Sequence, residues 1–325
     1  MPDFLGQPSG LVRAIVVSDS DENTQAPTDF TNELRVAISH DDHHTRRLHS
    51  LHNSTHGPSR YAYMRKNDQM IELVAGDTWM TVHPDEGGRI GRLQVNGQAL
   101  LNDNPAEMPF TWGCYPMVPW AGRVRRGRFS FDERSYQLPI NMPPHAIHGT
   151  GFVSRWEVLD AGLDYCDMAT DLPWAFGGRA TQHLQLDEHG LAAVLSVYAT
   201  AHTMPAVIGW HPCFTKPQSV DLEFANMYPR DDDYMPLAQL VTPPPKPWDD
   251  CFTEPLGPLR LHYPRLTVTV ESDCDHWVAY DMPEHITCVE PQSGPPDAFN
   301  IGGATRLQPG DLLQRHMSIR WTSRQ

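Results

Sequence analysis

The sequence from Met70 onward alternates short apolar runs with clusters of glycine, proline, asparagine and aspartate. Runs of this kind are typical of β-strands joined by turns. The expected strands, in chain order, are residues 71–74, 79–82, 93–95, 100–101, 128–131, 135–138, 157–159, 183–186, 191–200, 207–208, 220–224, 259–262 and 266–271. No segment shows a long apolar period of 3.6 residues, so we expect helices to be few and short.

Turn signals join several of these strands in pairs. Asn96 and Gly97 lie between two apolar runs and indicate a type I′ hairpin, while residues 132–134 and 187–190 read as further hairpin turns. No repeat recurs at a fixed spacing, and the composition does not shift after residue 70. The pattern predicts an all-β fold for residues 67–325, one large antiparallel domain of the sandwich or barrel class.

Residues 1–66 differ from the rest because they are rich in serine, aspartate, asparagine and histidine, with one short apolar run at 11–17. Such a segment lacks the apolar material for a core, so we expect a disordered extension. A histidine-rich tract can bind metal. The irregular spacing and the absence of cysteine favour a solvated tail instead, or a start codon placed too early. The histidines concerned are His40, His43, His44, His49, His52 and His56.

Composition narrows the possible functions. The formal net charge of -15 disfavours sequence-independent binding to nucleic acid or to anionic lipid, since both need a clustered positive surface. No run reaches the ~18 apolar residues of a membrane span, and the first residues lack the basic and long apolar regions of a signal peptide, so we expect none. The six cysteines form no C-x-x-C pair, which indicates neither a disulfide framework nor a structural metal. We therefore expect a cytoplasmic protein with reduced thiols, as a monomer or homodimer.

The stretch from Cys288 to Asp297 is the first candidate for chemistry. Its apolar run ends in Glu290, and the following residues are rich in proline and glycine. This order predicts a carboxylate at the end of a strand, where it could act as a base. The alternative is an ordinary exposed glutamate at a strand end.

Two further stretches carry basic side chains. Alternation over 123–125 would place Arg123 and Arg125 on one face of a strand, and Arg126 on the other. At least one arginine is then a candidate for a binding cleft, although arginines on a solvated hairpin are an equal alternative. His148 stands beside Gly149 and suits an imidazole that projects from a tight loop as a hydrogen-bond donor; it could equally be a structural histidine.

The last two stretches combine polar groups with aromatic residues. His211 follows an apolar run and precedes Pro212, whose missing N–H predicts a strand end at this point. Asp249 and Asp250 lie between Trp248 and Phe252. Carboxylates beside aromatic rings suit a sugar, which offers hydroxyls to the acids and an apolar C–H face to the rings.

Taken together, these motifs resemble the aldose 1-epimerase (galactose mutarotase) family. The resemblance covers residue 70 to the end and rests on the ordered set EGGRIGRLQVNG, PWAGRVRRGRF, HAIHG, GWHPCF, WDDCF and VEPQSGPPDAF. It implies an antiparallel β-supersandwich. It also implies the interconversion of the α and β anomers of an aldose, a small-molecule sugar substrate, without cofactor or metal.

The resemblance also implies a role for each candidate residue. The catalytic base of the family corresponds to Glu290 and its catalytic acid to His211, while its substrate-binding residues correspond to Arg123, His148 and Asp249. The chain departs from family members with galactose activity in two places. It has Asp250 where they commonly have histidine and Cys213 where they have tyrosine, which leaves a sugar other than galactose open.

Two other functions stay open on the sequence alone. An epimerase of hexose 6-phosphates would use an arginine such as Arg125 or Arg126 on the phosphate, and alternation favours Arg125 because it would share the face of Arg123. The acidic net charge argues against it. A non-catalytic carbohydrate-binding domain is the third reading. A binder needs no matched acid and base, which argues against this reading.

Overall fold

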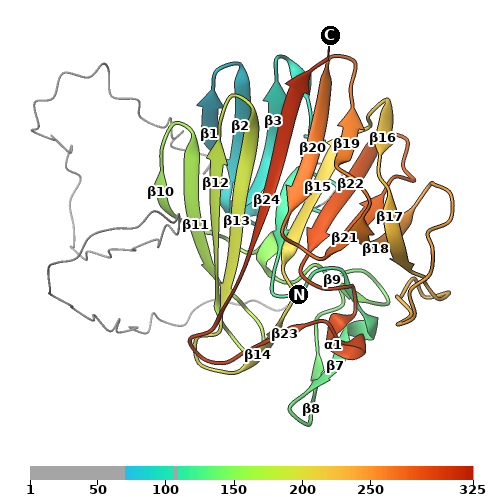
Figure 1. The fold of residues 1–325 in the computed structure, drawn as a ribbon. Coiled ribbons are helices and arrows are strands. Elements are labelled where there is room, and N and C mark those ends of the chain that lie inside the picture. Colours follow the sequence, from blue (N-terminus) through green and yellow to red (C-terminus); the bar gives the residue numbers. More distant parts are fainter. Residues whose placement is uncertain (1–69, 106–108, 325) are drawn as a thin grey trace, which may run out of the picture. The chain divides into compact units, whose positions relative to one another are not determined.

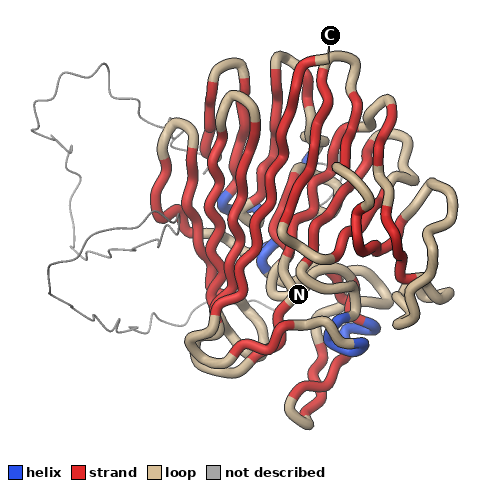
Figure 2. Tube along the Cα trace, in the orientation of Figure 1, coloured by secondary structure: helices blue, strands red, loops and turns tan. Residues whose placement is uncertain are grey.

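The computed structural model describes residues 70–105 and 109–324. The expectations for residues 1–66, including their disorder and their six histidines, lie outside the described residues, so the predicted domain boundary stays a prediction. Within the described part, strands and the turns between them make up nearly all of the chain (Figure 2). The one α-helix described is α1 (Ala298–Ile301). No described helix has the length and apolar character needed to cross a membrane.

The strands form two large sheets, in which every pairing is antiparallel (Figure 1). The ten-stranded sheet has the order β1 (Ile71–Ala75), β2 (Thr78–His83), β3 (Arg89–Val95), β5 (Cys114–Met117), β15 (Gly209–Thr215), β22 (Ile286–Gln292), β21 (His276–Tyr280), β18 (Asp249–Pro255) and β17 (Phe224–Tyr228), with β4 (Gln98–Ala99) beside β3. The eight-stranded sheet has the order β10 (Glu157–Ala161), β11 (Tyr165–Asp171), β12 (Arg179–Leu186), β13 (Gly190–Tyr198), β24 (Leu312–Ser323), β20 (Leu266–Ser272), β19 (Leu259–His262) and β16 (Ser219–Asp221). The predicted antiparallel β-sandwich with almost no helix is confirmed.

Three small two-stranded sheets complete the described structure. They pair β6 (Arg123–Val124) with β9 (Ala146–Ile147), β7 (Arg128–Phe131) with β8 (Arg134–Gln137), and β14 (Met204–Ala206) with β23 (Thr305–Leu307). The β6–β9 pair matters most for function because it carries Arg123 and leads directly into His148.

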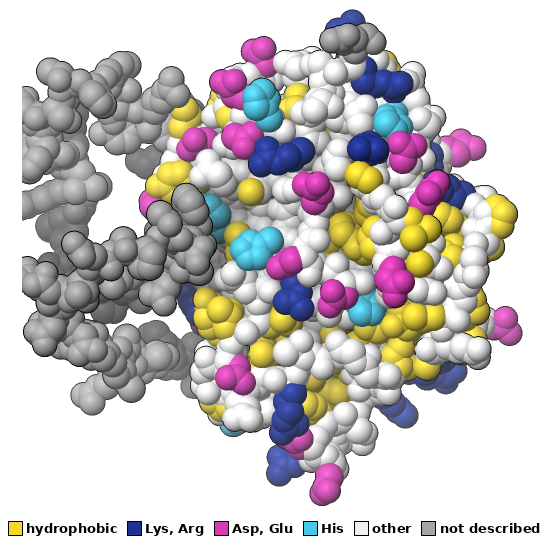
Figure 3. Space-filling model, in the orientation of Figure 1, with side chains coloured by type: hydrophobic (Ala, Val, Ile, Leu, Met, Phe, Trp, Pro, Cys, Tyr) yellow, Lys and Arg dark blue, Asp and Glu magenta, His cyan; other side chains and the backbone are white. Residues whose placement is uncertain are grey.

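The core lies between the two large sheets and follows from alternation along their strands. In β12, every second side chain is buried, as expected for a strand with one face in the core. The indole Nε1 of Trp210 on β15 donates to Oε1 of Gln182 on β12 at 3.1 Å, which joins the two sheets through buried polar atoms. The other face of the eight-stranded sheet is visible in Figure 3, where basic side chains are scattered among acidic ones. This face therefore offers no clustered positive surface.

The predicted hairpin turns are confirmed. Asn96 and Gly97 have φ angles of 48° and 78°, and Asp132 and Glu133 have φ angles of 48° and 61°. Positive φ at both central positions is the signature of a type I′ turn, whose twist matches that of the flanking strands.

The central strands were predicted less well. Residues 207–208 are not a strand, and the strand begins instead at Gly209 and runs through Pro212. Likewise, β22 continues past Glu290 through Pro291 to Gln292. Both strands are buried on both faces, so they do not alternate, and an internal proline in such a run reads as a break. The expectation that His211 and Glu290 stand at strand ends is therefore wrong.

Candidate active site

The two central strands β15 and β22 run side by side, but their backbone pairing is interrupted over one short stretch. The structure pairs residues on both sides of this stretch and, among the described residues, none within it. In regular antiparallel pairing, two of the four N–H groups needed here would come from Pro212 and Pro291, which have none. His211 and Glu290 lie opposite each other inside this gap in the ladder, because the register on either side places them so.

His211 and Glu290 are in direct contact. Nε2 of His211 lies 3.2 Å from Oε1 of Glu290, and the other carboxylate oxygen, Oε2, accepts a hydrogen bond of 3.3 Å from Nε2 of Gln292. The exposed fractions of His211 and Glu290 are 7% and 2%. Sequence reasoning did not single out Gln292, although its position two residues after Glu290 puts it on the same face of the strand.

The imidazole of His211 is held between aromatic rings. The ring of Tyr115 on β5 stacks on it with centroids 4.7 Å apart and an angle of 15° between the planes, and the ring of His148 meets it edge-on at 4.9 Å. Tyr115 is fully buried. A ring packed on one face and at one edge has little freedom to turn, so the direction of both nitrogen atoms is fixed.

Burial and charge act together on the acidity of this pair. Burial raises the pKa of Glu290 to about 7, against the opposing effect of His211. Burial alone would lower the pKa of His211, but the negative neighbours Glu290 and Cys213 outweigh it and raise this pKa to about 9. Between these two values the carboxylate is ionised and the imidazole is protonated.

His148 lies in a tight loop directly after β9, with a φ angle of 61°, followed by Gly149 at 80°. A Cβ atom on Gly149 would stand 2.1 Å from the carbonyl oxygen of Val118, so this position requires glycine. The pKa of His148 is well below its usual value because of burial and the nearby positive charge of His211 and Arg123. Its buried Nδ1 atom makes no hydrogen bond within the described structure. A neutral imidazole with an unused nitrogen is suited to a ligand hydroxyl.

Asp249, at the start of β18, is held by an arginine that the sequence reasoning missed. Arg230 places NH1 2.8 Å from Asp249 Oδ2 and Nε 2.7 Å from Asp250 Oδ1. Burial raises the pKa of Asp249 above its usual value, and Arg123 and Arg230 oppose this rise. The guanidinium of Arg230 also lies over the ring of Tyr234, 5.0 Å from its centroid. Arg230 therefore fixes the orientation of the Asp249 carboxylate, and Asp249 lines the cavity.

Arg123 and Arg125 do not lie together, contrary to the prediction from alternation. β6 ends at Val124, and residues 125–127 form a 3-10 turn, so the strand pattern stops before Arg125. The guanidinium of Arg125 turns away to Asp231, with NH2 2.6 Å from Oδ2. Arg123 stays at the cavity, and its carbonyl oxygen accepts a hydrogen bond of 2.6 Å from the N–H of Asp297.

All five residues expected from the sequence line one cavity of about 190 Å³. The full lining is Phe110, Thr111, Gly122, Arg123, Met142, Ile147, His148, His211, Asp249, Val278, Tyr280, Glu290, Gln292 and Pro296. A wider and shallower hollow of about 790 Å³ lies elsewhere, at the turn residues near Asp77, Glu188 and Arg320. It holds no buried acid and base in contact, so the smaller cavity is the better candidate site.

The aromatic residues of the cavity are not the predicted ones. Trp248 and Phe252, expected to face a sugar, pack on each other with centroids 4.7 Å apart and on Phe224 in the core. Phe252 is fully buried and neither ring lines the cavity. The rings that do so are Phe110 and Tyr280.

Comparison with known proteins relates the chain to one family. The family model described as aldose 1-epimerase matches residues 69–256, which include four of the five candidate residues and exclude Glu290. Two Escherichia coli (strain K12) proteins are similar in sequence. The uncharacterized protein YphB is 27% identical over 278 residues, which are 73% of this chain and 93% of YphB. The uncharacterized protein YihR is 26% identical over 273 residues, 74% of this chain and 88% of YihR.

Solved structures share the fold. A putative aldose 1-epimerase from Escherichia coli K12 aligns with a TM-score of 0.71 at 22% identity, covering 78% of this chain and 99% of the other. A galactose mutarotase-like protein from Clostridium acetobutylicum aligns with a TM-score of 0.73 at 17% identity, covering 82% and 99%.

Proposed function

Because the chain belongs to the aldose 1-epimerase family, we propose that it interconverts the α and β anomers of an unphosphorylated aldose by acid–base ring opening. The observation that carries this proposal is the contact of 3.2 Å between His211 Nε2 and Glu290 Oε1 at the cavity wall. A volume of about 190 Å³ suits one sugar ring rather than an oligosaccharide.

Ring opening needs two proton transfers at neighbouring atoms. Glu290 takes the proton of the anomeric hydroxyl, and His211 gives a proton to the ring oxygen. Both of these oxygens are bonded to the same carbon, so an acid and a base that lie side by side match the reaction. With pKa values of about 7 and about 9, the base is ionised and the acid is protonated in the same pH range. Each transfer contributes ~10²–10⁴ in rate.

The remaining candidates hold the sugar. Arg123 and His148 offer hydrogen-bond donors to hydroxyl groups, and the carboxylate of Asp249 offers acceptors. Val278 and Tyr280 give the cavity an apolar wall for the C–H face of the ring. After opening, rotation about the bond to the aldehyde carbon and closure by the reverse transfers yield either anomer.

The charges around the cavity support a free sugar over a sugar phosphate. Arg125, the expected phosphate ligand, pairs with Asp231 and lies outside the cavity lining. Arg230 is bound by two carboxylates, and Arg126 is 67% exposed at its side chain. Among the residues that the structure describes, Arg123 is then the one arginine in the cavity lining, whereas a phosphate monoester is best held by a bidentate guanidinium free of other partners.

Polarimetry tests the proposal directly. Freshly dissolved α-glucose and α-galactose are each followed with the wild-type protein and with Glu290→Gln as the blank. Acceleration by the wild type and not by the variant is expected. Binding of these sugars by calorimetry without any acceleration would instead identify a non-catalytic carbohydrate-binding domain.

The phosphate alternative needs its own comparison. We expect kcat/KM for glucose to exceed that for glucose 6-phosphate, and Arg125→Ala to change neither value by more than a small factor. A strong preference for the phosphorylated sugar that is lost in Arg125→Ala or Arg123→Ala would replace the proposal with a hexose-6-phosphate epimerase.

A further inference from the structure

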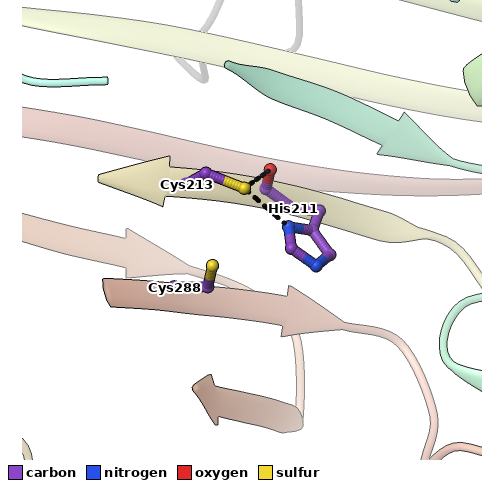
Figure 4. Close-up of side chains that lie close together, drawn as sticks. All are labelled: His211, Cys213 and Cys288. Carbon is purple, nitrogen blue, oxygen red and sulfur yellow. Dashed lines mark hydrogen bonds between the residues drawn. The ribbon is translucent and has the colours of Figure 1, made fainter. Parts of the chain in front are cut away.

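Two cysteines, Cys213 and Cys288, lie close to His211 (Figure 4). Sγ of Cys213 is 3.2 Å from Nδ1 of His211, and Cys288 lies opposite Cys213 on the neighbouring strand. Both cysteines are fully buried. The proposed function gives neither of them a role.

The alternation of the strands explains this grouping. His211 and Cys213 share one face of β15, and Cys288 and Glu290 share the same face of β22, two residues apart in each case. Two cross-strand pairs therefore stand next to each other, one of acid and base and one of thiols. The imidazole of His211 is engaged at both nitrogens, by Glu290 at Nε2 and by Cys213 at Nδ1.

We propose that Cys213 is a positioning residue for the proposed reaction, which keeps a proton on Nδ1 of His211 so that Nε2 is the nitrogen that exchanges a proton with the sugar. The role of Cys213 in a reaction rests on the proposed function. The protonation state of the His211 imidazole does not depend on it. It follows from the 3.2 Å contact in a site without room for the ring to turn. A neutral imidazole donates from one nitrogen and accepts at the other, so its partner at Nδ1 decides the role of Nε2.

The proton balance is complete within these groups. On ring opening, the Nε2–H bond of His211 breaks and an O–H bond forms at the ring oxygen, while Glu290 gains the anomeric proton. His211 is then neutral with its remaining proton on Nδ1, directed at the sulfur. Its Nε2 lone pair faces the sugar and takes the proton back on ring closure.

The electrostatics around the sulfur agree with an accepting thiolate. Burial would raise the pKa of Cys213, but the hydrogen bond with Cys288 and the positive charges of His211 and Arg89 outweigh burial and lower this pKa to about 6. Burial raises the pKa of Cys288 well above its usual value, so Cys288 keeps its proton and donates.

The other groups that face His211 do not hold the proton on its Nδ1 atom. Tyr115 from β5 stacks on the ring, and burial raises its pKa well above the usual value, so it is neutral. His148 is also neutral and meets the ring at its edge. Arg123 and Asp249 lie at the cavity, on the side of Glu290. Among the described residues, Cys213 is thus the side chain that contacts Nδ1 of His211.

The same three side chains could in principle hold a metal ion. Their ligand atoms all lie within 4.8 Å of one another, and two thiolates with an imidazole suit a thiophilic metal. Nδ1 of His211 is already engaged by Sγ of Cys213 at 3.2 Å, which favours the positioning role. Metal content is therefore one readout of the test.

The test follows the imidazole itself and the activity separately. The full-length chain is labelled with ¹⁵N-histidine, and the His211 signals are assigned by their loss in His211→Asn. In the wild type we expect Nδ1 to stay protonated when the ring becomes neutral. In Cys213→Ser we expect the pKa of His211 to fall by about 1 unit or more, with the Nε2–H tautomer appearing. The alkaline limb of kcat/KM shifts down by the same amount, and KM changes less than twofold.

Two further variants control for a general loss of structure in Cys213→Ser. Cys166→Ser removes another buried cysteine, on β11, and leaves the His211 signals and the pH profile unchanged. Cys288→Ser keeps Cys213 but weakens the donor to it, and gives a smaller shift in the same direction; it carries the test if Cys213→Ser does not fold.

Three results overturn the inference. They are an unchanged tautomer and pKa of His211 in Cys213→Ser, an unchanged pH profile in an active Cys213→Ser enzyme, and one equivalent of zinc in the purified wild type that is lost in Cys288→Ser. The expected tautomer in a protein that accelerates no mutarotation would contradict the proposed function alone.

Discussion

Nε2 of His211 lies 3.2 Å from Oε1 of Glu290 at the one point where the ladder between β15 and β22 is interrupted. Pro212 and Pro291 each follow one member of this pair, and each removes a backbone donor that would close the ladder. The two strands keep their register through the pairs on either side. The acid and base proposed for the reaction thus face each other across the gap in this ladder, while His211 pairs with Tyr115 on β5 and Glu290 pairs with Val278 on β21.

Glu290→Gln and His211→Asn should each lower kcat strongly and change sugar affinity little. Each replacement keeps much of the shape and some hydrogen bonding, but neither can exchange a proton as needed, so a loss of ~10²–10⁴ in kcat is expected. Steady-state polarimetry gives kcat, and calorimetry gives the affinity. Near-normal turnover in either variant would exclude that residue from the chemistry.

The dependence of kcat/KM on pH should be bell-shaped. Activity needs Glu290 ionised and His211 protonated. Because the pKa of Glu290 is about 7, activity rises as the pH increases through that value, and because the pKa of His211 is about 9, activity falls as the pH increases further. In His211→Asn the residual activity should lose its alkaline limb. A profile flat from pH 5 to pH 10 would contradict this assignment of acid and base.

Arg230→Ala should cost both stability and sugar binding. The side chains of Arg230, Asp249 and Asp250 are 22%, 19% and 12% exposed, so the loss leaves two poorly solvated carboxylates without their ion-pair partner. We expect a decrease of about 3 kcal/mol in the free energy of unfolding, the low end for a broken buried ion pair, and a higher KM. Denaturant unfolding and polarimetry measure these effects.

The matched control for this variant is Arg306→Ala. Arg306 pairs with Asp132 in a similar two-point contact, but both side chains are about half exposed, at 53% and 51%. Surface pairs contribute little, so stability and KM should stay near the wild-type values. Equal losses in the two variants would mean that burial of the Arg230 cluster is not what matters.

Gly209→Ala should disturb the spacing of the two central strands. A Cβ atom at this position would lie 2.1 Å from the carbonyl oxygen of Pro291, so β15 and β22 would have to separate where they carry the acid and base. Overpacking of this kind costs about 1–3 kcal/mol, and kcat should fall as well. Gly257→Ala is the control, since a Cβ atom there meets no atom within 4 Å. Thermal unfolding of both variants tests this prediction. An unchanged Tm for Gly209→Ala would contradict the close packing of β15 against β22.

The sequence predicted several strands that have one face in the core, such as β1, β12 and β13, because their side chains alternate and turn residues end them. It missed other alternating strands, among them β11, β21 and β24. It also failed at β15 and β22, whose residues are buried on both faces and which contain Pro212 and Pro291. A proline usually indicates a strand end. Here the two prolines face the same gap, a relationship between residues far apart in the sequence that no local pattern contains.

The candidate residues could be named from the sequence, but the partners that hold them could not. Arg230 binds Asp249 from a stretch without any motif, and Gln292 and Tyr115 reach Glu290 and His211 through the fold alone. Cys213 stood out only as a departure from the family pattern. Its contact with His211 depends on the rotation of both side chains, which alternation along a strand does not specify.

The two prolines between β15 and β22 also determine what a substrate has to break. A sugar that enters between His211 and Glu290 replaces one contact between side chains, at a stretch where β15 and β22 form no ladder pair. Entry of the sugar therefore does not require the paired residues of β15 and β22 to separate. In the proposed reaction, His211 and Glu290 can therefore separate and rejoin while the paired residues on either side keep their register.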